Sequence, residues 1–343
     1  MGLQIYDIIS KKDIQIKDLK GKTLVVDAFN VIYQFLTTIR QPDGTPLQDS
    51  KGRVTSHLSG LFYRNINLME NVIKLIYVFD GKHPDLKKLI HEKRQEAKEH
   101  ALEKYEQAVS EEDVEEMGKY SKSLSVLDKI KIEESKELLE AMGIAVVQAP
   151  GEGEAQASYI CKTNDEIYAI ASQDYDCLLF DAPRLIQNLT LARKRKISSG
   201  SYVDVVPQLI ELNNVLSELE INREQLICIG VLCGTDYNPG GVKGIGPKKA
   251  LKLVKEFKTA DRVFEEVAKM NEGKYEVWFD WKQIFDLMSD PEVNKDYKIE
   301  FGKFDFARVK EIMLEHDFSE ERIESQFEKI KGLNEAKKQR TLF

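Results

Sequence analysis

Four short apolar runs recur along the chain, and each has the length of one strand in a buried sheet. They lie at residues 23–27, 75–80, 143–147 and 167–171 and are rich in Val, Ile and Ala. Continuous apolar runs of this length, separated by stretches of helical periodicity, are typical of parallel strands covered on both faces. The pattern therefore predicts an α/β fold with a mostly parallel central sheet flanked by helices.

Acidic residues gather where these runs end, at the sheet edge where open parallel sheets bind their ligands. Taken singly, Asp27 or Asp80 is equally well explained as the acid that caps the next helix. Two later segments, however, carry closely spaced pairs of carboxylates, whereas a cap needs one acid. Such a cluster repels itself unless cations neutralise it, and Mg²⁺ prefers hard oxygen ligands. The predicted metal ligands are Asp27, Asp80, Glu152, Glu154, Asp174, Asp176 and Asp236.

Composition sets broad limits on the kind of protein. The chain has 343 residues, enough for one large or two smaller domains with a buried core. Its four cysteines show neither CxxC nor metal-binding spacing, which favours small buried side chains in a reducing compartment. No apolar stretch is long enough to span a membrane, and no signal peptide is evident. We expect an intracellular protein without a membrane partner.

Positive charge is concentrated in two segments although the formal net charge is −8. Residues 183–197 carry five Lys or Arg and no acid, and residues 243–258 carry six Lys against one Glu. An ordinary solvated helix face is the alternative interpretation of any such run. Two basic runs that flank an acidic centre fit contacts with a phosphate backbone better.

A glycine-rich turn precedes the second basic run. The segment 241–250 contains Gly-Ile-Gly-Pro followed by Lys248 and Lys249. The glycines permit a tight turn, and Pro247 suits the first position of a helix. Backbone N–H groups at such a turn can bind a DNA phosphate without reading a base. The pattern predicts a helix-hairpin-helix, the alternative being a plain connector between two packed helices.

Changes of pattern, rather than linkers, divide the chain. A charged segment of helical propensity at about 82–130 has little apolar content and reads as an insertion that projects from the body. The polar, basic C-terminal end reads as disordered. The predicted parts are 1–131 with this insertion, 132–260 with the helix-hairpin-helix at about 223–258, a helical part at 261–331, and a flexible tail at 332–343.

The chain resembles the flap endonuclease family, the structure-specific 5′ nucleases of DNA replication and repair in archaea and eukaryotes. The resemblance covers nearly the whole chain and implies a PIN-like 5′ nuclease core with a helical arch and a helix-hairpin-helix of the H3TH type. It also points to the cytoplasm of an archaeon, or to the nucleus of a eukaryote. It rests on residues 24–28, 32–36, 55–58, 62–64, 77–82, 149–155, 172–176 and 234–237, together with the Gly-Ile-Gly-Pro turn.

The resemblance implies cleavage of branched DNA near the junction of a 5′ flap and duplex, in Okazaki fragment maturation and in repair, with 5′→3′ exonuclease activity. The seven acids match ligands of two Mg²⁺ ions, or Mn²⁺, and a K⁺ ion is expected at the hairpin. Lys87 and Arg94 match a catalytic basic pair, two helical turns apart and so able to reach one phosphate. The implied DNA-binding residues are Gly2, Tyr33, Arg40, Thr55, Arg64, Gly244, Gly246, Lys248 and Lys249.

The C-terminus departs from the family pattern. Relatives usually end in a sliding-clamp box, in which a Gln is followed by an aliphatic residue and then by two aromatic residues. Gln339 and Leu342 fit the first half of that box, and the sequence ends at Phe343. The resemblance implies a sliding clamp of the PCNA type as a partner, with these three residues as candidate contacts. It also implies a monomer.

Three alternatives remain open from the residues. A related 5′ nuclease that acts as a processive exonuclease or on repair bubbles shares the acids, but the bubble-cutting relatives carry a much longer insertion than 82–130. A non-catalytic protein that binds DNA junctions would have lost a metal ligand or one of Lys87 and Arg94, and none is missing. A PIN-type ribonuclease is usually shorter and lacks the helix-hairpin-helix, so this element discriminates against it.

Overall fold

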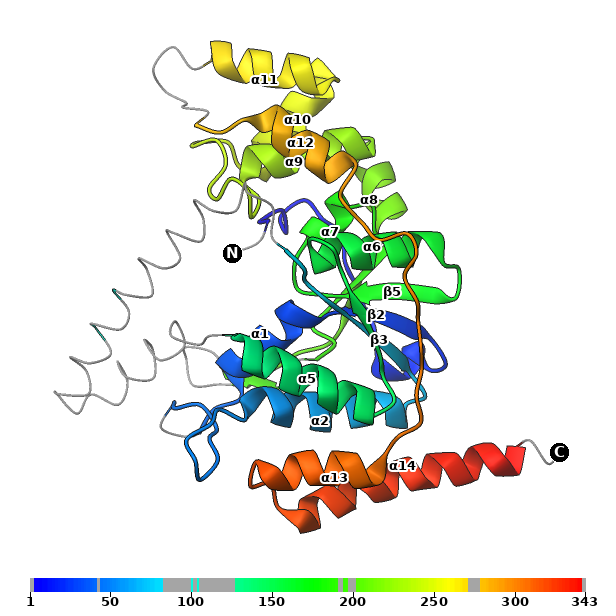
Figure 1. Ribbon diagram of the computed structural model, residues 1–343. Helices are drawn as coiled ribbons and strands as arrows, with labels where there is room; N and C mark the ends of the chain where they lie inside the picture. The colour runs from blue at the N-terminus through cyan, green and yellow to red at the C-terminus, as the bar shows by residue number, and fades with distance from the viewer. Residues whose placement is uncertain are drawn as a thin grey trace.

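A seven-stranded sheet forms the centre of the molecule (Figure 1). The computed structural model describes residues 3–41, 44–82, 100, 104, 127–190, 194–196, 202–270 and 278–340. The strand order is β1-β9-β6-β5-β2-β3-β4, and the pairs from β6 through β4 are parallel, whereas β9 and β1 add an antiparallel edge. The strands are β1 (Lys12–Asp13), β2 (Thr23–Asp27), β3 (Lys74–Phe79), β4 (Ala145–Gln148), β5 (Ile167–Ala171), β6 (Arg184–Gln187) and β9 (Gln208–Glu211). The predicted mostly parallel sheet is confirmed.

The apolar runs are continuous because each strand contributes side chains to two hydrophobic cores, one on each face of the sheet. In β2, Leu24 and Val26 point into the core on one face, and Val25 between them points into the core on the other. In β3, Tyr77 and Val78 divide in the same way. Successive side chains of a strand point to opposite faces, so a sheet covered on both sides needs apolar residues at every position.

Helices cover both faces of the sheet (Figure 1). One face carries α1, α2 and α5, with α14 packed outside α2 and α13 packed against α5 and α14, and the other carries α6 and α7. These helices are α1 (Ala28–Thr38), α2 (Ser56–Glu70), α5 (Lys129–Ala141), α6 (Gly153–Thr163), α7 (Asp176–Leu179), α13 (Phe306–Glu315) and α14 (Glu320–Arg340).

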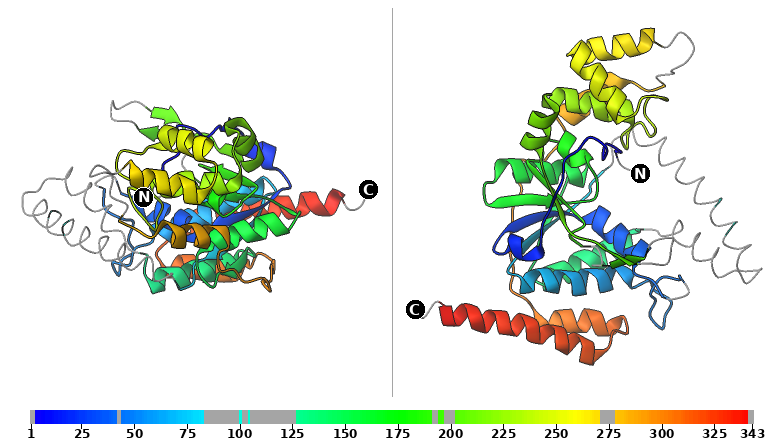
Figure 2. Two further views of the ribbon diagram at one scale, coloured as in Figure 1. Left: turned by 90° about the horizontal axis from the view of Figure 1, so that it is seen from above. Right: turned by 180° about the vertical axis from the view of Figure 1, so that it is seen from behind.

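A second helical group lies beyond α7, at the opposite end of the molecule from α13 and α14 (Figures 1 and 2). Its members are α8 (Leu212–Leu219), α9 (Arg223–Cys233), α10 (Pro247–Phe257), α11 (Ala260–Lys269) and α12 (Trp281–Ser289). A short hairpin of β7 (Lys194–Lys196) and β8 (Tyr202–Asp204) and a 3-10 helix at Ile16–Leu19 complete the described elements. No helix in the described ranges is both long and apolar enough to cross a membrane.

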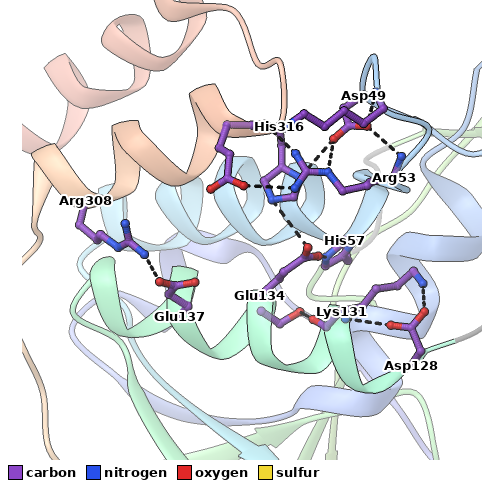
Figure 3. A network of polar contacts seen from close by, with 12 residues as sticks. Asp49, Arg53, His57, Asp128, Lys131, Glu134, Glu137, Arg308 and His316 are labelled. Atoms are coloured by element: carbon purple, nitrogen blue, oxygen red, sulfur yellow. Dashed lines mark hydrogen bonds and ion pairs between the residues drawn. The ribbon is translucent and has the colours of Figure 1, made fainter.

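Ion pairs fasten the segment before α2 to the C-terminal helices (Figure 3). Arg53 Nε donates to Asp49 Oδ2 over 2.6 Å, and the same guanidinium reaches the Glu315 side chain at 3.2 Å. Glu134 of α5 lies between two histidines, with Oε2 2.9 Å from His57 Nε2 and Oε1 3.7 Å from His316 Nε2. The network therefore joins α2, α5 and the end of α13.

Helix α14 continues into the predicted tail as far as Arg340. Leu, Glu, Ala, Lys, Gln and Arg in this stretch are strong helix formers. The flexibility of 332–343 stays a prediction. The insertion at 82–130 falls almost wholly outside the described residues.

Candidate metal centre and DNA-binding surface

Six of the predicted acids come from four places in the chain but lie together at the carboxyl ends of the strands, and Asp236 precedes Tyr237, whose hydroxyl donates to Glu152. Asp27 is the last residue of β2 and caps α1 through a hydrogen bond from the Asn30 backbone N–H, so its interpretation as a cap is also correct. Burial, Asp80 and Asp174 together raise the pKa of Asp27 to about 7. The charges of Asp80 and Asp174 are among its causes after burial, so the carboxylates after β2, β3 and β5 lie near one another.

The pKa of Glu154 shows that α6 also contributes to this group of acids. Its pKa is raised well above the ordinary value of a carboxyl, first by burial and then by the carboxylates of Asp174, Asp27, Asp176 and Glu152. A carboxyl group whose pKa is raised by four neighbouring carboxylates lies inside the cluster, not on a solvated face. The pair at the start of α6 and the pair after β5 therefore face the same space.

Asp80 is held by the glycine between the two glutamates. Its Oδ1 accepts a hydrogen bond from Gly153 N over 2.8 Å. A Cβ atom built on Gly153 would lie only 2.4 Å from that oxygen, so a side chain there would displace the Asp80 carboxylate or the backbone. The Glu-Gly-Glu spacing thus places two acids on the first turn of α6 and leaves room for a third carboxylate between them.

Hydrogen-bond donors that the sequence reasoning missed hold several of these acids. Ser172 Oγ donates to Asp27 Oδ2 over 3.1 Å, and Asn30 Nδ2 donates to Asp174 Oδ2 over 2.9 Å. The Tyr237 hydroxyl donates to Glu152 Oε2. Each donor lies within three residues of a predicted ligand in sequence, but the carboxylate that it holds belongs to a different segment of the chain.

The donor set suits a hard divalent cation. All seven predicted ligands are carboxylates, the group that Mg²⁺ and Mn²⁺ take in proteins, and mutual repulsion within a buried cluster is what a cation relieves. In the described part of the chain, no three Asp, Glu, His or Cys side chains stand in a ready-made metal-binding arrangement. Several of the acids face protein donors instead, as the contacts of Asp27, Asp80 and Asp174 show. The residues fit the ion by chemistry and by convergence.

The helix-hairpin-helix forms at the predicted place. α9 begins at Arg223, and α10 begins with Pro247 at its first position, after Gly246 as the N-cap. Gly244 adopts φ +84°, the left-handed region that favours glycine. Gly244, Gly246 and Lys248 are exposed, and Lys249 is half-buried. The turn therefore offers open backbone and positive charge at the start of a helix.

The remaining predicted DNA contacts lie on or beside α1 and α2. Tyr33 on α1 is 42% exposed, which leaves its ring available for stacking. Thr55 is buried at the start of α2, and Arg64 is half-buried on the same helix. Arg40 donates to the carbonyl oxygens of Leu36, Thr37 and Gly44, so its guanidinium closes the end of α1. Their roles toward DNA stay predictions.

Several predicted residues lie outside the described residues. These include the proposed catalytic pair and the start of the chain, together with most of the clamp box. They are Gly2, Lys87, Arg94, Leu342 and Phe343. Gln339 lies on α14, and nothing is described of its side chain.

Comparison with known proteins agrees with this geometry. The XPG N-terminal domain matches residues 1–101 and the XPG I-region matches residues 143–236. Flap endonuclease 1 of Thermococcus onnurineus is 49% identical over 344 aligned residues, covering 100% of this chain and 98% of the relative. Flap endonuclease 1 of Pyrococcus furiosus is 48% identical with the same coverage of both.

Solved structures give the same picture. Flap endonuclease-1 from Methanococcus jannaschii superposes with a TM-score of 0.76 at 42% identity, covering 98% of this chain and 100% of that one. The catalytic core of Rad2 gives a TM-score of 0.70 at 22% identity over 95% of this chain and 98% of that one, which shows the shared fold. With full-length identity near one half and both family domains in place, the chain belongs to the flap endonuclease family.

Proposed function

We propose that the protein cuts 5′ flaps from branched DNA by hydrolysing one phosphodiester bond near the flap junction, using two Mg²⁺ ions held by the seven carboxylates. The flap endonuclease relatives support a structure-specific, metal-dependent nuclease. The observation that carries the finer proposal is the convergence of the acids, which raises the pKa of both Asp27 and Glu154. Mn²⁺ is the proposed substitute for Mg²⁺.

Each group of residues has a distinct part in this reaction. Two divalent ions, when bound, activate a water molecule and neutralise the charge that develops on the leaving oxygen. Asp27, Asp80, Glu152 and Glu154, together with the acids after β5 and α9, would hold the ions. Lys87 and Arg94 would stabilise the charge on the scissile phosphate.

The free-energy cost of bringing the scissile phosphate to the carboxylates selects for a flap. The scissile phosphate reaches buried carboxylates only if the terminal nucleotides leave the duplex, which costs a few kcal/mol, roughly, and least at a flap or a frayed end. Tyr33 would stack on the unpaired base next to the phosphate. The turn at Gly244 and Gly246 would grip the duplex backbone through its N–H groups and a K⁺ ion. The same access at a free 5′ end gives 5′→3′ exonuclease activity.

Partners and place of action follow from the family. A sliding clamp of the PCNA type is the proposed protein partner, through Gln339, Leu342 and Phe343. The enzyme would act as a monomer on flaps left by Okazaki fragment synthesis and by repair. The archaeal relatives support the cytoplasm of an archaeon as the place of action.

Cleavage of a 5′-labelled double-flap DNA with a one-nucleotide 3′ flap tests the proposal. A single cut near the junction, present with Mg²⁺ and absent with EDTA, is the expected result, and matched duplex and single-stranded RNA serve as controls. The Lys87→Ala variant should then bind the flap but cut it far more slowly. Tight binding without a cut would favour a junction-binding protein, and preference for the RNA would favour a ribonuclease.

A further inference from the structure

Two of the clustered acids are joined by a closed ring of hydrogen bonds. Asp27 Oδ1 accepts from Asn30 N over 3.2 Å, and Asn30 Nδ2 donates to Asp174 Oδ2 over 2.9 Å. Asp174 N donates to Ser172 Oγ over 3.2 Å, and that hydroxyl donates to Asp27 Oδ2 over 3.1 Å. We call these four residues the carboxylate ring.

The carboxylate ring joins segments that are far apart in sequence. Asp27 ends β2, and Asp174 follows β5, the parallel neighbour of β2 in the sheet. The side chain of Asn30 also accepts from Gln173 N over 3.2 Å, so its amide is fixed at both ends. An amide whose oxygen and nitrogen both have partners has one orientation, and its NH₂ group must then face Asp174.

The chemistry of the two bridging groups is informative. A lysine or arginine between Asp27 and Asp174 would neutralise them and compete with a cation. Asn30 and Ser172 are neutral, so they orient the carboxylates and leave their charge in place. Neutral donors that fix the orientation of acidic ligands are the outer-shell partners that metal sites use.

We propose that Asn30 and Ser172 are positioning residues that hold Asp174 and Asp27 in the orientation required to bind the divalent ions. This inference rests on the proposed metal centre and adds the residues that pre-organise it. Ser172 is buried and Asn30 is half-buried, so water competes little for these bonds. Removing either donor should let one carboxylate rotate, which weakens the ions' binding and leaves the DNA grip at Gly244 and Gly246 unchanged.

Binding of Mn²⁺ without DNA tests the inference, with the free ion followed by electron paramagnetic resonance. Asn30→Leu keeps the side-chain volume and removes the amide, and Ser172→Ala removes only the hydroxyl. Each should weaken Mn²⁺ binding by about 10- to 100-fold. The Mg²⁺ concentration for half-maximal cleavage should rise by a similar factor. Flap binding in EDTA should not change.

A matched control separates positioning from general stability. Asn71→Ala removes an amide that donates to Asn67 O over 2.9 Å at the far end of α2, and it should leave Mn²⁺ affinity unchanged. In an Asp174→Ala background, Asn30→Leu should cause no further loss of Mn²⁺ affinity, because the group it orients is gone.

The inference is overturned if both variants bind Mn²⁺ within twofold of the wild type, or if only their unfolding midpoints change. A different result would remove its basis: if Asp27→Ala and Asp174→Ala each bind Mn²⁺ as tightly as the wild type, the metal centre itself is wrong. The two failures are distinguishable by the variants that reveal them. A wrong metal centre appears as unchanged Mn²⁺ affinity in Asp27→Ala and Asp174→Ala. A wrong positioning role leaves those two variants impaired and spares only Asn30→Leu and Ser172→Ala.

Discussion

The hydroxyl of Tyr237 donates a hydrogen bond to Oε2 of Glu152, and the two residues are only 4% and 8% exposed. This contact links the turn after α9, within the helix-hairpin-helix, with the start of α6 in the acidic cluster. Burial and the neighbouring Glu152 raise the pKa of the Tyr237 hydroxyl above its ordinary range, so it stays protonated and acts as a donor.

Tyr237→Phe is therefore expected to affect both stability and cleavage. The variant keeps the ring and removes one donor from a buried carboxylate, which should cost about 1–3 kcal/mol of unfolding free energy. Cleavage should fall by roughly 10- to 100-fold, because Glu152 loses a partner that orients it. Urea unfolding and single-turnover cleavage of a flap substrate measure the two effects.

Tyr77→Phe is the matched control for this substitution. The Tyr77 hydroxyl is also buried and donates to Asn65 Oδ1 over 2.8 Å, within the sheet core and between neutral groups. It should lower stability but leave the cleavage rate of the folded enzyme unchanged. Equal losses of cleavage in the two variants would mean that Tyr237 has no specific role at the acidic cluster.

Gly153→Ala should disturb the site with a single methyl group. The new Cβ would lie 2.4 Å from Asp80 Oδ1, so either this carboxylate or the first turn of α6 must move. We expect cleavage to fall by at least tenfold and Mg²⁺ to be required at higher concentration, as for other changes next to metal ligands. Gly332→Ala, where a Cβ has no atom within 4 Å, is the control and should behave as wild type. Wild-type cleavage by Gly153→Ala would show that Asp80 is not needed in its present position.

Asp174→Ala should separate DNA binding from catalysis. The proposed duplex contacts at Lys248 and Lys249 belong to α10, whereas Asp174 follows β5. We expect the variant to bind a double-flap DNA as the wild type does in EDTA and to lose cleavage by several orders of magnitude. Fluorescence anisotropy and a cleavage time course measure the two. A loss of binding as large as the loss of cleavage would show that DNA binding and catalysis do not depend on separate residues.

The sheet and the acids were predictable because buried parallel strands leave a strong pattern. Every predicted run falls on an observed strand, β2, β3, β4 or β5, with boundaries shifted by two residues or fewer. Strands β1, β6 and β9 of the sheet were missed, since they are short and carry polar residues such as Lys12, Arg184 and Gln208. Short polar strands take their conformation from pairing with a neighbour, and that pairing is not written in their own sequence.

The donors around the acids were not predictable for a different reason. Asn30 and Ser172 are ordinary polar residues in a helix and a loop, and only the adjacency of β2 and β5 brings each one to its carboxylate. The helix-hairpin-helix was predictable because Gly244 and Pro247 have local backbone requirements. Contacts set by local backbone chemistry can be read from sequence, whereas contacts set by tertiary adjacency cannot.

Lys248→Ala should weaken DNA binding in a way that depends on salt. Lys248 is exposed in the first turn of α10, the turn that also carries the unpaired backbone N–H groups of a helix start. Loss of one phosphate contact should lower the slope of log Kd against log salt by about one, equally for flap and plain duplex. Lys331→Ala on α14, at the other end of the molecule, should not change that slope (Figure 2). An unchanged slope for Lys248→Ala would exclude it as a phosphate contact.

The fully buried His57 should make stability depend on pH. Burial lowers the pKa of its imidazole, with Lys131 and His316 acting in the same direction, and the hydrogen bond with Glu134 only partly opposes this (Figure 3). The unfolded chain therefore binds a proton at His57 more readily, near its ordinary pKa of 6.5. The contribution of the neutral His57 to the free energy of unfolding is fully present above that pH. It is lost as the pH falls toward the folded pKa, by at most about 1.4 kcal/mol per pH unit for one proton.

His57→Gln isolates this contribution. The glutamine amide can still donate to Glu134 but cannot titrate, so the variant removes the proton linkage and keeps a polar partner in the buried position. Urea unfolding at pH 5.5, 6.5 and 7.5 should show a smaller decline toward low pH for the variant than for the wild type. The difference between the two curves is the measurement, because acids elsewhere in the chain titrate in both. Parallel curves would mean that His57 keeps an ordinary pKa in the folded protein and that the pair with Glu134 offsets its burial.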